Sequence, residues 1–391
     1  MSFLTAAQLL APELLALKQD LHAHPELSFQ EKRTTALLRE KLTALGLALI
    51  DIGMDTGVVA LLRGGHAGKT VALRADMDAI CQQEPAGPGA SEVPGIMHAC
   101  GHDFHTAALY GAATLLAAER ERLCGNVAFL FQPAEEVTRG AAAMVEHGLW
   151  DALPQRPCAL FGLHNRPELP RGQVAVIEGP VMAGKVHFEI TLRGLAGHGG
   201  SPHKCIDVIV PGAAIVSALQ SVVSRNTDPM DALVCSVCSI HAGTPENFAP
   251  DLLTMTGSIR AHSNTVLEHT QARIWTLARG IGESYGCTAE VQFIPQVPVT
   301  CNTPEMTALA RRAALAVVGA AQIVSPPPDL GSEDFAVFGQ EVPSFFYWLG
   351  SGFPGRENAC WHSPYFRTDD GALPLGAALL AQAAAEGLEG N

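Results

Sequence analysis

Three short apolar runs in the first half of the chain are each followed closely by polar side chains. The runs are Thr70 to Arg74, Val127 to Phe131 and Ala159 to Leu163. Runs of this kind are typical of strands buried in a parallel sheet. They lead into Asp76 and Asp78, into Glu135 and Glu136, and into His164. Because open α/β sheets bind ligands beyond the carboxyl ends of their strands, we expect these side chains to meet at one edge.

Size and charge exclude several classes of protein. The chain has 391 residues, of which 48% are hydrophobic, so two or three domains with a substantial core are expected. Its net charge is −14, from 25 basic and 39 acidic residues, and no basic stripe is present. Nucleic-acid surfaces need clustered Lys and Arg, so we expect no nucleic-acid partner. The sequence contains no uninterrupted apolar stretch of about 20 residues, so no membrane span is predicted.

The N-terminal residues do not have the pattern of a signal peptide. Glu13, Lys18 and Asp20 interrupt the apolar residues of segment 1–21 at helical spacing. We therefore expect a cytoplasmic protein whose ten cysteines are reduced. Cys235 and Cys238 form a C-x-x-C pair within a predicted strand, where positions three apart point to opposite faces. This pair is not expected to be functional.

The order of predicted elements indicates one domain inserted into another. As far as about Met182, helices and strands alternate in the α/β pattern of a mostly parallel sheet. Strands and helices then follow in the order β-α-β-β-α-β, which is typical of a ferredoxin-like antiparallel sheet with two helices on one face. Their predicted ranges are 186–192, 206–224, 233–240, 252–260, 266–285 and 288–294. We therefore expect a catalytic domain over residues 1–184 and 295–391, and an inserted domain over 185–294.

A dense group of metal-capable side chains precedes the predicted helix 106–121. His98, Cys100, His102, Asp103 and His105 lie within eight residues. Thiolate and imidazole ligands suit Zn²⁺ or another late transition metal better than Ca²⁺ or Mg²⁺. Two other interpretations stay open: a buried cysteine beside a helix-capping Asp103 and surface histidines, and a nucleophilic Cys–His pair.

Glu135 and Glu136 are adjacent after the second run. Adjacent acids often do no more than open a helix, but here one carboxylate could bind a metal while its neighbour moves a proton. The candidate ligands are Cys100, His102, Glu136, His164 and His362. Five ligands are too many for one tetrahedral site with an open position, so a two-metal site fits the count. Two ions about 3.5 to 4 Å apart can share a water, lower its pKa and polarise a carbonyl, which is hydrolytic machinery.

Six segments also carry a resemblance to a known family. They are residues 21–29, 74–79, 97–103, 131–136, 331–335 and 362–364. The chain resembles, over essentially its whole length, the metallopeptidase family of aminoacylases and glutamate carboxypeptidases, and within it the hippurate hydrolase and auxin-conjugate amidohydrolase subgroup. The resemblance implies a phosphorylase/hydrolase-like α/β catalytic domain interrupted by a ferredoxin-like dimerisation or lid domain. It also implies two divalent metal ions per subunit and a homodimer or larger homo-oligomer.

The resemblance extends to individual roles. Cys100, His102, Glu136, His164 and His362 match the metal ligands of the subgroup, and Glu135 matches its general base. Glu135 would take a proton from a water held between the metals and pass it to the departing amine. Cysteine and histidine favour Zn²⁺, although a mixed site with carboxylates could use Mn²⁺, Co²⁺ or Ni²⁺.

Three further residues match positions that contact substrate in relatives. His198, in a glycine-rich loop, matches a histidine that reaches the substrate oxygen, often across the dimer. The simpler interpretation of His198 is an exposed turn residue. Asn247 and Arg260 match positions that hold the substrate carboxylate, although an arginine on a strand can merely face solvent.

Some positions depart from the pattern of the subgroup. They are Cys81, Phe104, Pro245 and Glu246. An extra acid at Glu246, near the expected carboxylate site, could disfavour simple anionic substrates. Asp76 stands where the wider family has a histidine, and we do not expect it to be a direct metal ligand.

Together these features predict a metal-dependent amidohydrolase. Its expected substrates are hippurate-like N-acyl or N-aroyl amino acids, cleaved to a carboxylic acid and a free amino acid. A dipeptidase and an N-acetyl-diaminopimelate deacetylase are alternatives of the same class. A cysteine hydrolase using Cys100 and a non-catalytic metal-binding or ligand-binding protein are alternatives of other classes. The presence of Glu135 beside all five candidate ligands argues against a non-catalytic protein.

Overall fold

The computed structural model describes residues 1–243 and 247–389, so Pro245 and Glu246 lie outside the described residues. The chain forms two compact units. The larger contains Met1–Gly179, Cys301–Pro327 and the chain from Asp334 onward, and the smaller contains Pro180–Thr300 and Pro328–Glu333. The smaller unit therefore extends a few residues beyond the expected range 185–294 at both ends, and it includes a short segment from much later in the chain.

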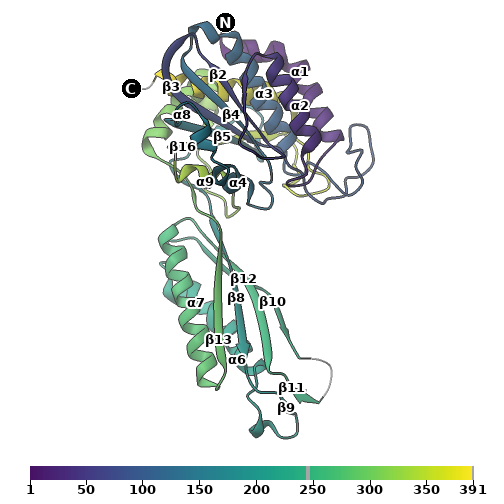
Figure 1. Cartoon of the computed structure of the whole chain (residues 1–391), viewed down its shortest axis with the longest axis vertical. Coiled ribbons are helices and arrows are strands. Elements are labelled where there is room, and N and C mark those ends of the chain that lie inside the picture. The colour runs from purple at the N-terminus through teal and green to yellow at the C-terminus, as the bar shows by residue number, and fades with distance from the viewer. Residues whose placement is uncertain (244–246, 390–391) are drawn as a thin grey trace. The chain divides into compact units, whose positions relative to one another are not determined.

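The larger unit is built on an eight-stranded sheet with the order β1-β2-β4-β3-β5-β16-β6-β15. Figure 1 labels β2, β3, β4, β5 and β16 of this sheet. Its strands are β1 (Ala48–Ile50), β2 (Val58–Arg63), β3 (His66–Asp76), β4 (Cys124–Gln132), β5 (Ala159–Pro170), β6 (Val174–Ala175), β15 (Ile323–Val324) and β16 (Ser344–Gly352). At its centre, β3 pairs in parallel with β4 and β5, and β5 pairs in parallel with β16. The α/β fold with a mostly parallel sheet, predicted from the apolar runs, is confirmed.

Five long helices pack on this sheet and on one another. They are α1 (Phe3–Ala23), α2 (Lys32–Ala44), α3 (His102–Ala118), α8 (Pro304–Val318) and α10 (Leu373–Glu389). Small residues let α3 and α10 approach closely, since a Cβ added at Gly111 would lie 2.7 Å from Ala377 Cβ. Among the described residues, Asp370–Glu389 is the one helix long and apolar enough to cross a membrane, and most of it is buried in this core. Three short helices, α4 (Gly140–Glu146), α5 (Leu149–Ala152) and α9 (Phe335–Gly339), complete the unit.

Two elements differ from the sequence prediction in ways that affect the site. Helix α3 begins at His102, four residues earlier than predicted, because Gly101 turns the chain with φ 89°. Such a backbone conformation is accessible to glycine at little cost. Strand β5 continues past Leu163, and its residue His164 pairs with Trp348 of the neighbouring strand β16. His164 therefore lies within a strand rather than in a loop.

The smaller unit has the predicted ferredoxin-like order. Its elements are β8 (Gly184–Arg193), α6 (Ile209–Asn226), β10 (Leu233–Ala242), β12 (Leu252–Ala261), α7 (Asn264–Ser284) and β13 (Thr288–Val297). The sheet order is β10-β12-β8-β13 and every pair is antiparallel. Alternate side chains of β8, such as Phe188 and Ile190, are buried in a core shared with the two helices. The strands β9 (Gly197–His198) and β11 (Phe248–Ala249) form a separate small ladder, and β7 (Gly179–Met182) and β14 (Thr300–Asn302) lie where the chain changes unit.

All ten cysteines are free thiols. Cys235 is partly buried in β10, and this burial raises the pKa of its thiol to about 11. A thiol with so high a pKa is a poor nucleophile at neutral pH. Cys235 therefore has the properties of a structural cysteine.

A buried ionic contact joins α1 to the start of α3. His22 Nδ1 lies 2.8 Å from Asp103 Oδ2, and His22 Nε2 lies 3.2 Å from Glu84 Oε1. Burial lowers the pKa of His22, but the two carboxylates raise it further, to about 9. His22 is therefore protonated at neutral pH and donates to both carboxylates.

Replacing His22 with Gln should destabilise the protein in a pH-dependent way. Because the pKa of His22 rises from 6.5 to about 9 on folding, its stabilising effect is complete below pH 6.5 and is lost as the pH approaches 9. Urea denaturation should show that His22→Gln lowers the free energy of unfolding by about 2 kcal/mol at pH 6 and by much less above pH 9. An equal loss at both pH values would contradict the assignment of a charged His22.

Candidate metal centre

Four distant segments bring the five candidate ligands into one group, which we call the ligand cluster. Its members are Cys100 and His102 at the start of α3, Glu136 after β4, His164 in β5, and His362 after β16. Cys100 Sγ lies 3.4 Å from His164 Nε2. Glu136 Oε1 lies 3.8 Å from His102 Nε2, and its Oε2 lies 3.3 Å from His362 Nε2. The carboxylate of Glu136 thus stands between two imidazoles.

The distances and the burial within the ligand cluster fit divalent metal ions. Two nitrogen or oxygen ligands of a tetrahedral zinc ion are separated by roughly 3.4 Å, and a sulfur and a nitrogen ligand by roughly 3.6 Å. The observed separations lie close to these values. His102 Nε2 and Glu136 Oε1 are also buried without a hydrogen-bond partner. Unpaired buried polar atoms are costly, and a cation between these two would satisfy both.

The charges around the cluster favour a cation. Burial lowers the pKa of His102, but the carboxylates of Asp76, Asp78 and Glu136 raise it further, to about 10. The hydrogen bond with Glu136 raises the pKa of His362. Burial holds the pKa of His164 well below its usual range, so its imidazole is neutral, as a metal ligand must be.

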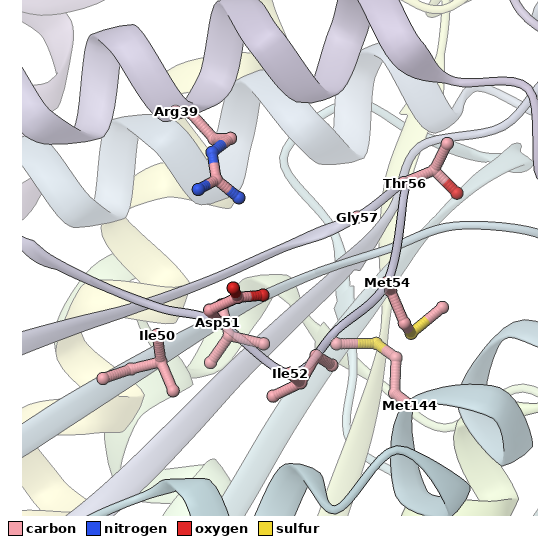
Figure 2. Close-up of a pocket in the computed structure, with 9 residues that line it drawn as sticks. Arg39, Ile50, Asp51, Ile52, Met54, Thr56, Gly57 and Met144 are labelled. Atoms are coloured by element: carbon pink, nitrogen blue, oxygen red, sulfur yellow. The ribbon is translucent and has the colours of Figure 1, made fainter.

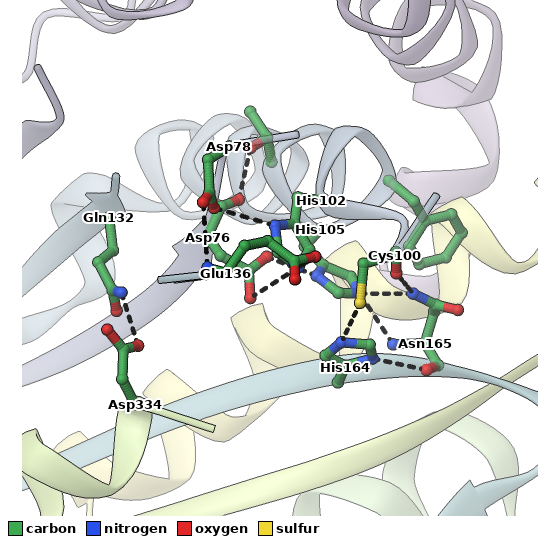
Figure 3. Close-up of polar contacts among 12 residues, drawn as sticks. Asp76, Asp78, Cys100, His102, His105, Gln132, Glu136, His164, Asn165 and Asp334 are labelled. Atoms are coloured by element: carbon green, nitrogen blue, oxygen red, sulfur yellow. Dashed lines mark hydrogen bonds and ion pairs between the residues drawn. The ribbon is translucent and has the colours of Figure 1, made fainter. Parts of the chain in front are cut away.

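Asp78 orients the His102 ligand. Its Oδ1 lies 3.1 Å from His102 Nδ1, which leaves Nε2 directed toward Glu136 (Figure 3). Its Oδ2 accepts hydrogen bonds from Ser28 Oγ at 2.7 Å and from the backbone N–H of Glu136 at 3.1 Å. One carboxylate therefore fixes both a ligand ring and the backbone of a second ligand. Metal-bound histidines commonly have a carboxylate partner of this kind.

His105 lies next to the cluster but is not available as a ligand. The backbone N–H of Asn165 donates to His105 Nε2 at 2.9 Å, so this nitrogen carries no proton. The proton is therefore on Nδ1, which donates to Asp76 Oδ1 at 2.6 Å. Asp76 also accepts from Arg74 Nη1 at 2.8 Å. His105 and Asp76 thus brace the site.

Asn165 is a site residue whose role the sequence did not reveal. Its Nδ2 donates to the backbone carbonyl of Cys100 at 2.6 Å (Figure 3). Its Oδ1 accepts from Trp361 Nε1 at 3.3 Å. Asn165 thereby connects β5 to the segments that carry Cys100 and His362. Its only sequence signal was its position directly after His164.

Glu135, the predicted base, lies at the cluster. It is buried, with 7% of its surface exposed, and a carboxylate oxygen lies within 4.8 Å of ligand atoms of His102 and Glu136.

His98 and Asp103, the other two metal-capable residues of segment 98–105, both lie near His22. Asp103 binds His22, and the ring of His98 lies 6.5 Å from that of His22.

The predicted substrate-binding residues lie in the smaller unit, at two opposite ends of its sheet. His198 pairs with Phe248, and Asn247 accepts a hydrogen bond from the backbone of Gly199, so these two residues lie close together beyond the Leu252 end of β12. Arg260 lies at the other end of β12 and donates to the carbonyl of Leu330 at 2.9 Å. The structure therefore brings His198 and Asn247 together, but not Asn247 and Arg260.

A hollow elsewhere in the larger unit does not offer a metal site comparable to the ligand cluster. It is lined by Arg39, Ile50, Asp51, Ile52, Met54, Thr56, Gly57, Val59 and Met144 (Figure 2). Asp51 is the one carboxylate in this lining, which contains neither histidine nor cysteine. It therefore lacks the donor set of a transition-metal site.

Comparison with known proteins agrees with this geometry. Residues 72–386 match peptidase family M20/M25/M40. An N-acetylcysteine deacetylase of Bacillus subtilis is 40% identical over 96% of this chain and 97% of its own length. An IAA-amino acid hydrolase, ILR1-like 4, of Arabidopsis thaliana is 37% identical over 95% of this chain and 84% of its own length. A crystal structure of a dinuclear metal-binding peptidase from Bacillus subtilis superimposes with a TM-score of 0.86, at 37% identity, covering 98% of this chain and 99% of that one.

Replacing Asp78 with Asn should weaken metal binding about 10- to 100-fold, because His102 loses its charged partner. The measurement is competition between the protein and a chelator, with bound metal determined by elemental analysis. Asp51→Asn is the matched control, since Asp51 is exposed and accepts a hydrogen bond from Gly53 in a surface turn. Equal metal affinity in the wild-type protein and Asp78→Asn would contradict the role of Asp78.

Proposed function

The chain belongs to peptidase family M20/M25/M40 and is a hydrolase acting on amide bonds, and we propose that it removes the acyl group from N-acyl or N-aroyl amino acids, including hippurate-like ones. The observation that carries this proposal is the ligand cluster with Glu135 beside it. Two ions bound there, zinc or manganese, with cobalt or nickel as alternatives, would polarise the amide carbonyl and lower the pKa of a water. Amide hydrolysis needs this activation together with a group that moves a proton.

Glu135 is suited to move that proton. Its carboxylate lies within 4.8 Å of His102 and Glu136 ligand atoms and is largely shielded from solvent. It would take a proton from the attacking water and deliver it to the nitrogen of the departing amino acid. Glu136, one residue later, would hold a metal. Adjacent residues after β4 would thus divide metal binding and proton transfer between them.

The substrate class is inferred from the relatives. The Bacillus subtilis relative is named an N-acetylcysteine deacetylase, and the Arabidopsis relative an IAA-amino acid hydrolase. The compound in each name is an amino acid whose amine carries an acyl group. The solved dinuclear relative is named a peptidase, which supports a dipeptidase as the second candidate function. The two differ in one requirement, since a dipeptidase needs the free amine that an acyl group blocks. Ten free thiols support a place in the reducing cytoplasm.

The spacing within the smaller unit supports a homodimer with shared active sites. Arg260 pairs with Lys185, and Leu252, at the His198 end, pairs with Arg193. Eight residues of strand separate the two ends of β12, or roughly 27 Å. An N-acyl amino acid is much shorter than this. If Arg260 and His198 both contact one substrate, they must come from different chains.

Replacing Glu135 with Gln should leave both metals bound and lower kcat by at least about 10³-fold, because proton transfer is lost. Steady-state hydrolysis of an N-acetyl amino acid and metal analysis of the same sample provide the test. Residual activity within tenfold of wild type, at full metal content, would remove Glu135 as the base.

Mixing two inactive variants should restore activity if His198 acts across a dimer. A heterodimer of Glu135→Gln and His198→Ala contains one site with Glu135 from one chain and His198 from the other. Unfolding and refolding the mixture should therefore recover up to about a quarter of wild-type activity, since half of the dimers are mixed and each mixed dimer has one intact site. No recovery, with mixed dimers verified by mass, would place His198 in the same chain as the site that it serves.

A further inference from the structure

The turn that carries Glu135 is conformationally unfavourable. We call residues 133–140, which run from the end of β4 to the first residue of α4, the base turn. Ala134 and Thr138 each have φ 55° although neither is glycine. For residues with a Cβ this left-handed conformation is disfavoured, and it persists only where surrounding contacts enforce it. The direction in which Glu135 leaves the turn therefore depends on the contacts that hold Ala134.

Hydrogen bonds within the turn fix part of this geometry. The carbonyl of Ala134 accepts from the backbone N–H of Gly140 at 3.0 Å, and the carbonyl of Glu135 accepts from Thr138 at 2.7 Å. The turn is so tight that a Cβ at Gly140 would lie 1.6 Å from the carbonyl oxygen of Pro133. These bonds engage carbonyl groups on the N-terminal side of the turn. The N–H of Ala134 needs an acceptor from elsewhere.

Glu31 provides that acceptor. Its side chain is fully buried, and its Oε1 accepts the backbone N–H of Ala134 at 2.8 Å. On the other side of Glu135, the N–H of Glu136 is held by Asp78 Oδ2 at 3.1 Å. The two backbone N–H groups that flank the base are therefore each bound by a carboxylate.

The Glu31 carboxylate does not cap its own helix, although the backbone of Phe29 and of Glu31 itself also contributes hydrogen bonds to it. Glu31 occupies the N-cap position of α2, yet its side chain makes no capping hydrogen bond there. The first turn of α2 is capped by Glu26, whose two oxygens accept from the N–H groups of Arg33 at 2.9 Å and Thr34 at 2.8 Å. The carboxylate of Glu31 is thus dispensable for the start of the helix.

Stability does not explain Glu31 either. Its Oε2 is buried and has no hydrogen-bond partner. Burial, with a contribution from Asp78, raises the pKa of Glu31 to about 7, despite the hydrogen bonds that lower it. A carboxyl group whose pKa rises on folding reduces stability as the pH increases from 4.5 to 7. A buried acid that weakens the fold and contacts the base turn is more consistent with a role in the site than in the core.

We propose that Glu31 is a positioning residue for Glu135: by accepting the N–H of Ala134 it locks the left-handed conformation that aims Glu135 at the ligand cluster. This inference rests on the proposed function of Glu135 as the base. The relevant property of Glu31 is a buried acceptor oxygen at one position. Its charge is not required.

Two substitutions separate the acceptor from the charge. Glu31→Gln keeps an oxygen in place for the N–H of Ala134, whereas Glu31→Met has a similar volume and no such acceptor. We expect Glu31→Met to lower kcat about 100-fold, as a misplacement of about 1 Å can, with KM and metal content within about twofold of wild type. Glu31→Gln should keep kcat within about threefold. Glu26→Met is the matched control: it removes the cap of the same helix and should lower stability without lowering kcat.

A second measurement does not depend on activity. Hydrogen exchange at the amide of Ala134 should be slow in the wild-type protein and in Glu31→Gln, and at least tenfold faster in Glu31→Met. Should Glu31→Met fail to fold, Glu31→Ala takes its place in both measurements.

The outcomes are separable. Unchanged kcat in Glu31→Met, or an equal loss in Glu31→Gln, would overturn the positioning role, and unchanged exchange at Ala134 would overturn the hydrogen bond itself. A wild-type protein inactive on every amide substrate would defeat the proposed function, while the exchange rates would still decide whether Glu31 holds the turn.

Discussion

The buried guanidinium of Arg74 is the contact on which the site most depends. It is fully buried near the end of β3 and binds Gln132 of β4 at 2.7 Å, Asp76 at 2.8 Å and Asp334 at 3.1 Å. Removing one partner from a buried charge group of this kind typically costs about 3–5 kcal/mol, because the remaining charge is left uncompensated. Arg74 therefore ties the ends of two central strands and the start of α9 into one rigid edge, on which the ligands are arranged.

Charge at this edge explains both its stability and its chemistry. Asp76 and Asp78 stay ionised because neighbouring cations, foremost His102, lower their pKa more than burial raises it. Their negative charge in turn favours a cation beside His102, whose buried Nε2 has no hydrogen-bond partner. Metal binding at the ligand cluster would thus be coupled to folding, since the same carboxylates brace the sheet edge and orient the proposed ligands. The proton transfer proposed for Glu135 would require this arrangement to be in place beforehand.

The sequence predicted what depends on local pattern. Apolar runs located β3, β4 and β5, and polar residues at their ends located Glu136 and His164 of the cluster, because periodicity and strand direction are local properties. The order β-α-β-β-α-β likewise predicted the antiparallel sheet of the smaller unit. The start of α3 was misplaced, since Gly101 had no visible role until its positive φ was known.

Contacts between distant segments could not be predicted in this way. His22 meets Asp103, 81 residues away, and Arg74 meets Asp334, 260 residues away. Glu31 gives no sequence signal beyond an acid at the start of a helix, because its partner is a backbone N–H 103 residues later. The separation of Asn247 from Arg260 emerged only from the strand register.

The most direct test of metal-dependent amide hydrolysis is a metal titration of protein that has been stripped by chelator, following amino-acid release from N-acetyl amino acids and N-benzoylglycine. We expect no activity without metal and a maximum at two equivalents of Zn²⁺ or Mn²⁺ per chain. Full activity in the stripped protein, abolished by alkylation of Cys100, would contradict a metal-dependent mechanism and favour a cysteine nucleophile.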